Sequence, residues 1–165
     1  SLDDSKWRVI VLDCFFTRFP TVCPGMAIAM KKLQDAFKKN DTSFLQFISV
    51  SIDPWHDSVP QLRKFAYRFN ASPDTWWFVT GDKKEIYDFA LQEMKASVAD
   101  TLVDTGFIHT SLFFLLDREK IVGGFYDGFD SVAQKKLVRD IPLLMLEKER
   151  KKTFGEFLKE LFGRS

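Results

Sequence analysis

The stretch R-V-I-V-L-D-C-F-F-T-R-F-P-T-V-C-P-G-M at 8–26 decides the fold. Its first nine residues form a nearly continuous apolar and β-branched run, which is typical of a strand buried on both faces of a sheet. From Pro24 onward apolar residues recur at helical spacing, and proline is favoured in the first turn of a helix. The stretch therefore predicts a central strand, a loop and a helix whose N-terminus carries Cys23.

The remainder of the chain alternates between strand and helix patterns. Strands are predicted at 44–52 and 76–80, helices at 59–69 and 84–96, hairpin strands at 111–116 and 121–126, and a helix from 131 onward with Pro142 as a candidate break. This order predicts an α/β domain of thioredoxin-like fold, with a central mixed sheet, flanking helices and an extra C-terminal helix. We divide the chain into a thioredoxin-like domain at 1–147 and a basic, amphipathic C-terminal helix at 148–165.

Composition narrows the classes of function. The 165 residues are 45% hydrophobic, enough for one domain with a substantial core. Lysine and arginine (24) almost balance aspartate and glutamate (23), and a net charge of +1 argues against nucleic acid as a partner. The chain begins with Ser1 and not with methionine, so we expect that an export signal or membrane tether could precede it. Apolar residues at helical spacing in 154–162 indicate contact with a membrane surface, a second subunit or the domain's own sheet.

The two cysteines occupy different environments in this prediction. A thiol at a helix N-terminus is favoured as thiolate, and Cys23 is therefore a candidate nucleophile or metal ligand. Cys14 lies inside the predicted central strand, where we expect it to be buried and inert. His109 comes just before the hairpin, and in a thioredoxin-like fold that loop passes close to the first helix. A thiolate beside an imidazole would form a metal site or a base–nucleophile pair.

Four short motifs follow one another along the chain. They are C-F-F-T-R-F-P-T-V-C-P at 14–24, V-S-I-D-P at 50–54, F-V-T-G at 78–81 and F-I-H-T-S at 107–111. Together they resemble the Sco/SenC family of copper-handling proteins. The resemblance implies copper bound by two motif cysteines and a histidine, and a protein partner in the assembly of cytochrome c oxidase. It also implies an exported protein, periplasmic or membrane-anchored.

The chain departs from that family's pattern at the ligand positions. Cys23 matches the second cysteine and His109 the histidine, but Phe19 stands at the place of the first cysteine. One thiolate and one imidazole give at best a two-coordinate Cu(I) site, so we expect copper binding to be weakened or lost. Met26 and His56 are candidate replacement ligands. Their alternative roles are a packing residue on the buried helix face and a solvated side chain.

Cys23 alone also allows an enzyme, a single-cysteine thiol peroxidase or a thiol–disulfide oxidoreductase. The peroxidase motif places threonine three residues before the cysteine, whereas this chain has Pro20 there and Thr21 one place later. Exchange within a cysteine pair is excluded by Phe19, and Cys14 lies too early on the strand to replace it. We therefore favour an assembly or metal-carrying protein over an enzyme.

Overall fold

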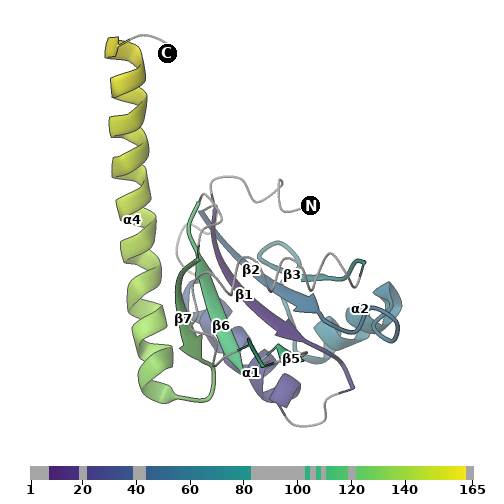
Figure 1. Ribbon diagram of the computed structural model, residues 1–165. Coiled ribbons are helices and arrows are strands. Elements are labelled where there is room, and N and C mark those ends of the chain that lie inside the picture. Colours follow the sequence, from purple (N-terminus) through teal and green to yellow (C-terminus); the bar gives the residue numbers. More distant parts are fainter. Residues whose placement is uncertain are drawn as a thin grey trace.

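The computed structural model describes residues 8–18, 22–38, 44–82, 103–104, 107–108, 111–118 and 122–162. Its main sheet has five strands in the order β3-β2-β1-β6-β7 (Figure 1). The central strand is β1 (Val9–Phe15), and β2 (Leu45–Ser51) and β3 (Trp76–Val79) run parallel to it on one side. On the other side β6 (Leu112–Leu116) and β7 (Val122–Asp127) form an antiparallel hairpin. The predicted mixed sheet is thus confirmed.

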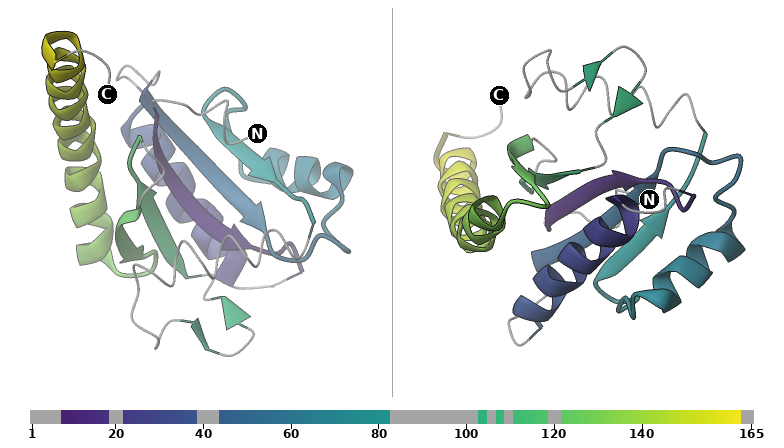
Figure 2. Two further views of the ribbon diagram at one scale, coloured as in Figure 1. Left: turned by 45° about the horizontal axis from the view of Figure 1, so that its top comes forward. Right: turned by 90° about the horizontal axis from the view of Figure 1, so that it is seen from below.

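Two helices pack on one face of this sheet, α1 (Val22–Ala36) and α2 (Val59–Arg68). A hairpin of two-residue strands, β4 (Val103–Asp104) and β5 (Phe107–Ile108), lies on the opposite side from α1 (Figure 2). The sequence did not predict this hairpin. The helix predicted at 84–96 lies outside the described residues.

Strand β1 divides the core into two apolar layers, because successive side chains point to opposite faces. Val11 and Phe15 pack with α1 and α2, whereas Leu12 and Cys14 pack with β2 and β6 on the other face. Every residue of β1 is buried, as predicted for a central strand. By the same alternation the one acidic residue of the strand, Asp13, lies on the helix-covered face.

Helix α2 has well-formed ends. Ser58 caps its N-terminus, and Asn70 follows its C-terminus in the left-handed conformation with φ of 52°. The N–H of Asn70 donates to the carbonyl of Tyr67, and the N–H of Ala71 donates to the carbonyl of Ala66. These paired bonds satisfy two of the last carbonyls of the helix. The helix predicted at 59–69 is thus observed at Val59–Arg68, and Asn70 lies in the turn that follows it.

The C-terminal helix α4 (Ser131–Phe162) packs its first half against β7 and extends well beyond the sheet (Figure 1). Leu137 and Ile141 are fully buried, and the Tyr126 hydroxyl donates to Asp140 at 2.7 Å. The candidate break at Pro142 is wrong, since α4 continues through it. Pro142 is exposed, and burial of apolar residues on both sides of it offsets the one missing hydrogen bond.

The proposed boundary between 147 and 148 falls inside α4 and stays a prediction. None of the described helices combines the length and the apolarity needed to cross a bilayer.

Candidate metal and thiol site

The backbone of Cys23 lies in the first turn of α1, as predicted. This helix begins where β1 ends, at the edge of the sheet that also receives the C-terminal ends of the parallel strands β2 and β3. Helix N-termini present unpaired N–H groups and the positive end of the helix dipole. No acidic residue of the first turn opposes this field. The position therefore favours a thiolate at Cys23.

A buried carboxyl group fastens the residues that directly follow β1. Asp57 is fully buried and accepts hydrogen bonds from the Thr17 N–H at 3.1 Å, from the Thr17 hydroxyl and from the Ser51 hydroxyl at 2.6 Å. Thr17 lies two residues beyond β1, whereas Asp57 belongs to the loop that follows β2. Asp57 thus joins the ends of both strands and fixes the start of the segment that carries Cys23. We call this set of hydrogen bonds the Asp57 clamp.

His56 is half exposed beside the clamp. Its Nδ1 lies 2.9 Å from Oδ2 of Asp53, and a guanidinium nitrogen of Arg18 lies 3.4 Å from the same oxygen. Desolvation alone would raise the pKa of Asp53, but the hydrogen bond and charge of His56, with Arg18, hold that pKa below its usual value. With Nδ1 bound to Asp53, Nε2 is the ring atom left to bind a metal.

Met26 lies in the core. It is fully buried, and its thioether packs so closely against Gly128 that a side chain there would have no room. Met26 thus has the packing role that was predicted as the alternative to a ligand role. The close contact also fixes the second turn of α1 against the turn between β7 and α4.

Cys14 is buried and free, as predicted from its place inside the central strand. Burial strongly raises the pKa of its thiol, and the neighbouring Asp13 carboxyl adds to the effect. A thiol with so high a pKa is a poor nucleophile and a poor metal ligand at neutral pH.

Asp13 is a buried ionisable residue for which the sequence predicted no role. The Ser49 hydroxyl donates to its Oδ1 at 2.5 Å, and the Trp76 indole N–H donates to the Ser49 oxygen at 3.0 Å. These bonds link β1, β2 and β3 through their side chains. Burial raises the pKa of Asp13 to about 7, although the Ser49 hydrogen bond acts in the opposite direction. The sequence signal that could have indicated this buried carboxyl group is a lone acidic residue inside an apolar strand.

A family model described as SCO1/SenC matches residues 2–145. The chain belongs to the SCO1/SenC family. This family is associated with copper handling and with the assembly of cytochrome oxidase.

Individual SCO1/SenC relatives agree with this assignment. A SCO1 protein homolog of Bacillus subtilis is 34% identical over 142 residues, covering 86% of this chain and 73% of that protein. Among solved structures, a SCO1/SenC family lipoprotein of Bacillus anthracis superposes with a TM-score of 0.72 at 32% identity, over 86% of this chain and 84% of that one. BsSco, a member of the Sco family of cytochrome c oxidase assembly proteins, superposes with a TM-score of 0.71 at 33% identity, over 87% of this chain and 84% of that one.

A copper-bound structure shares the fold at lower identity. Arabidopsis thaliana ScoI with copper bound has a TM-score of 0.63 at 22% identity, over 86% of this chain and 88% of that one. The likeness supports the common fold of SCO1/SenC proteins.

The described part of this SCO1/SenC domain does not include all of the predicted ligands. Within it, no three histidine, cysteine, aspartate or glutamate residues lie close enough to hold a metal ion. Phe19, His109 and the side chain of Cys23 lie outside the described residues. Strand β5 ends at Ile108, one residue before His109, and its hairpin lies at the end of the sheet where α1 begins (Figures 1 and 2).

Proposed function

We propose that this SCO1/SenC domain serves the assembly of cytochrome c oxidase, with its copper binding weakened or lost because Phe19 occupies a ligand position. The observation that carries the proposal is the place of Cys23 in the first turn of α1, at the carboxyl edge of the parallel strands. The Asp57 clamp supports it, because it fixes Thr17, which belongs to the described part of the motif at 14–24.

The available donor atoms are our reason for expecting a reduced affinity for copper. A thiolate at Cys23 and a neutral imidazole at His109 suit Cu(I), but Phe19 supplies no donor atom. Met26 is packed in the core, so the remaining candidate for a third ligand is Nε2 of His56. Copper is cargo in this proposal and is passed to or received from a protein partner.

Location and contacts follow from the same proposal. An exported or membrane-anchored protein is supported by the Bacillus anthracis relative, which is a lipoprotein. The apolar positions in 154–162 belong to the part of α4 that projects beyond the sheet (Figure 1). We assign them to contact with a membrane surface or a second subunit.

Cu(I) titration against a chromophoric chelator tests the copper part. We expect weak binding by the wild type, a loss of about tenfold or more in Cys23→Ser and His109→Ala, and a large gain in Phe19→Cys. Cys14→Ser is the matched control, because its thiol is buried away from the site, and it should leave the affinity unchanged. Equal copper uptake by the wild type, Cys23→Ser and His109→Ala would contradict the ligand assignment.

The helix N-terminus also favours a thiol-redox function of Cys23, in a peroxidase or an oxidoreductase. In peroxide reduction the thiolate sulfur would attack a peroxide oxygen, the O–O bond would break, and sulfenic acid and an alcohol or water would form. Peroxide consumption with sulfenate trapped at Cys23, and none in Cys23→Ser, would favour this function. If no sulfenate is trapped, the result favours the assembly function over the thiol-redox function.

A further inference from the structure

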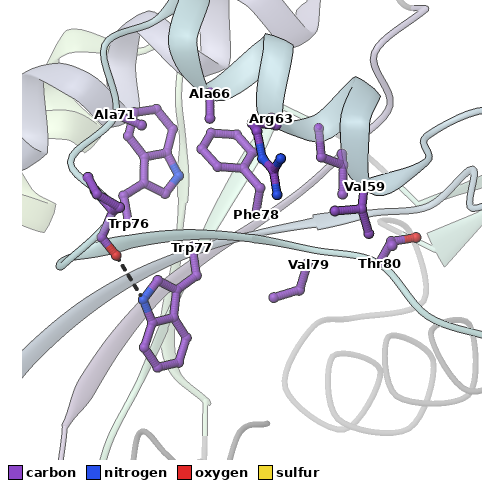
Figure 3. Close-up of a pocket in the computed structure, with 11 residues that line it drawn as sticks. Val59, Arg63, Ala66, Ala71, Trp76, Trp77, Phe78, Val79 and Thr80 are labelled. Atoms are coloured by element: carbon purple, nitrogen blue, oxygen red, sulfur yellow. Dashed lines mark hydrogen bonds between the residues drawn. The ribbon is translucent and has the colours of Figure 1, made fainter.

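A groove of about 530 Å³ lies between α2 and β3, outside the candidate metal site (Figure 3). Ala71 and Trp76 lie at one end, Val59 and Thr80 at the other, and Arg63 extends from α2 toward Phe78 between them. The wall is therefore mostly apolar, with one guanidinium group and one hydroxyl group.

The groove follows the outer edge of β3. Trp76 and Phe78 point toward α2, whereas Trp77 and Val79 point away from it, yet all four side chains line the groove (Figure 3). A space bordered by both faces of a strand must run along one of its edges. The other edge of β3 pairs with β2, and no described strand pairs with the outer edge.

Backbone groups face this edge as well. In a parallel ladder, alternate residues direct their N–H and C=O groups to the neighbouring strand, and the residues between them direct theirs away. The carbonyl of Thr75 accepts from the N–H of Phe47 in β2. By this alternation the backbone N–H and C=O groups of Trp77 also point to β2. The backbone N–H and C=O groups of Phe78 point to the outer edge, where they offer one donor and one acceptor.

Two polar side chains show what the groove could recognise. The Thr80 hydroxyl is buried without a hydrogen-bond partner among the described residues, which is unusual for a buried polar atom. Arg63 makes no ion pair with a described carboxylate. Helix α2 carries Arg63, Lys64 and Arg68 and no acidic residue. The groove therefore favours a ligand with apolar side chains and a negative charge.

We propose that this groove binds an extended, acidic and apolar segment of a partner protein, which adds to β3 as a further strand. Backbone hydrogen bonds would form along the edge at Phe78, apolar side chains would fill the groove, and a carboxylate would meet Arg63. The proposal does not depend on copper binding.

One end of the groove lies close to the candidate metal site. Thr80 follows the C-terminal end of β3, and Val59 begins the helix that follows the loop of His56 and Asp57. Because β1 and β3 both run parallel to β2, their C-terminal ends lie at the same end of the sheet. This end of the groove therefore lies at the end of the sheet where α1 and Cys23 begin. A partner held there would be anchored beside the candidate metal site.

Selection from a random peptide library on the whole chain tests the proposal. We expect enrichment of peptides that alternate apolar and acidic residues. Measured by fluorescence polarisation, their affinity should fall about tenfold or more in Arg63→Glu. Lys64→Glu is the matched control, since it makes the same charge change on α2 without lining the groove, and we expect less than about a twofold change.

Peptide backbone methylation separates strand addition from simple charge attraction. Methylating the amide that pairs with Phe78 should abolish binding, whereas methylating the next amide should not. Peptides that bind Arg63→Glu as tightly as the wild type would overturn the proposal. So would the absence of any enriched peptide on a protein whose circular dichroism shows it folded.

Discussion

Two buried aspartates, Asp13 in the middle of the sheet and Asp57 at its edge, show how surroundings decide the role of one side chain. Asp57 accepts three hydrogen bonds from Thr17 and Ser51 and holds two loops together. Asp13 accepts one side-chain hydrogen bond, from Ser49, and burial raises its pKa to about 7. Asp57, with three donors around it, joins two loops, whereas the single side-chain donor at Asp13 does not offset the effect of burial on its pKa.

The largest expected effect concerns Asp13 and pH. Its pKa is raised from 3.8 to about 7 on folding, so the folded protein holds this proton more tightly than the unfolded chain. Its contribution to stability is complete below pH 3.8 and is lost as the pH rises to about 7. The loss amounts to about 4 kcal/mol. Asp13→Asn stays neutral and should gain that much relative to the wild type between pH 4 and 8, measured by urea unfolding.

A constant difference between the two proteins across this pH range would contradict the raised pKa of Asp13. Asp74→Asn, at an exposed position, is the control and should leave the pH dependence of the wild type in place.

The second effect concerns the Asp57 clamp. Asp57→Ala leaves the donors of Thr17 and Ser51 without their acceptor, and we expect a loss of about 3 kcal/mol in the free energy of unfolding. Hydrogen exchange should also increase at the Thr17 amide. If Asp57→Ala unfolds with the free energy of the wild type, the clamp does not stabilise the fold.

The smallest effect belongs to Ser49, which lies between Asp13 and Trp76. Ser49→Ala should cost about 1 kcal/mol, and it should raise the pKa of Asp13 further because the Ser49 hydrogen bond lowers that pKa. Carboxyl-carbon NMR titration measures the change. A lower pKa in Ser49→Ala would mean that the hydrogen bond does not stabilise the charged form.

Local patterns were sufficient to predict most of the fold. The apolar run of β1, the proline at the start of α1 and Asn70 at the end of α2 each act through neighbouring residues. The strands β4 and β5 were missed because two residues are too few to show a period. Pro142 misled the prediction, since packing of α4 against β7 outweighs the local preference of proline.

The site was predictable only in part, because its central contacts join distant residues. Cys23 could be placed at a helix N-terminus from the motif alone. The Asp57 clamp joins residues 40 positions apart, and nothing near Asp57 in the sequence indicates Thr17 as its partner. Packing of Met26 against Gly128 likewise depends on how α1 meets the end of β7, which no local pattern fixes.

The projecting helix α4 also determines which way the domain faces. Its 32 residues span about 48 Å, starting near the sheet edge that holds Cys23 and running toward the opposite end (Figure 1). Any surface or subunit that holds the distal half of α4 would therefore lie on the far side of the molecule from Cys23. Such an arrangement would turn the Cys23 edge and the adjoining end of the groove outward, where an incoming partner could reach both.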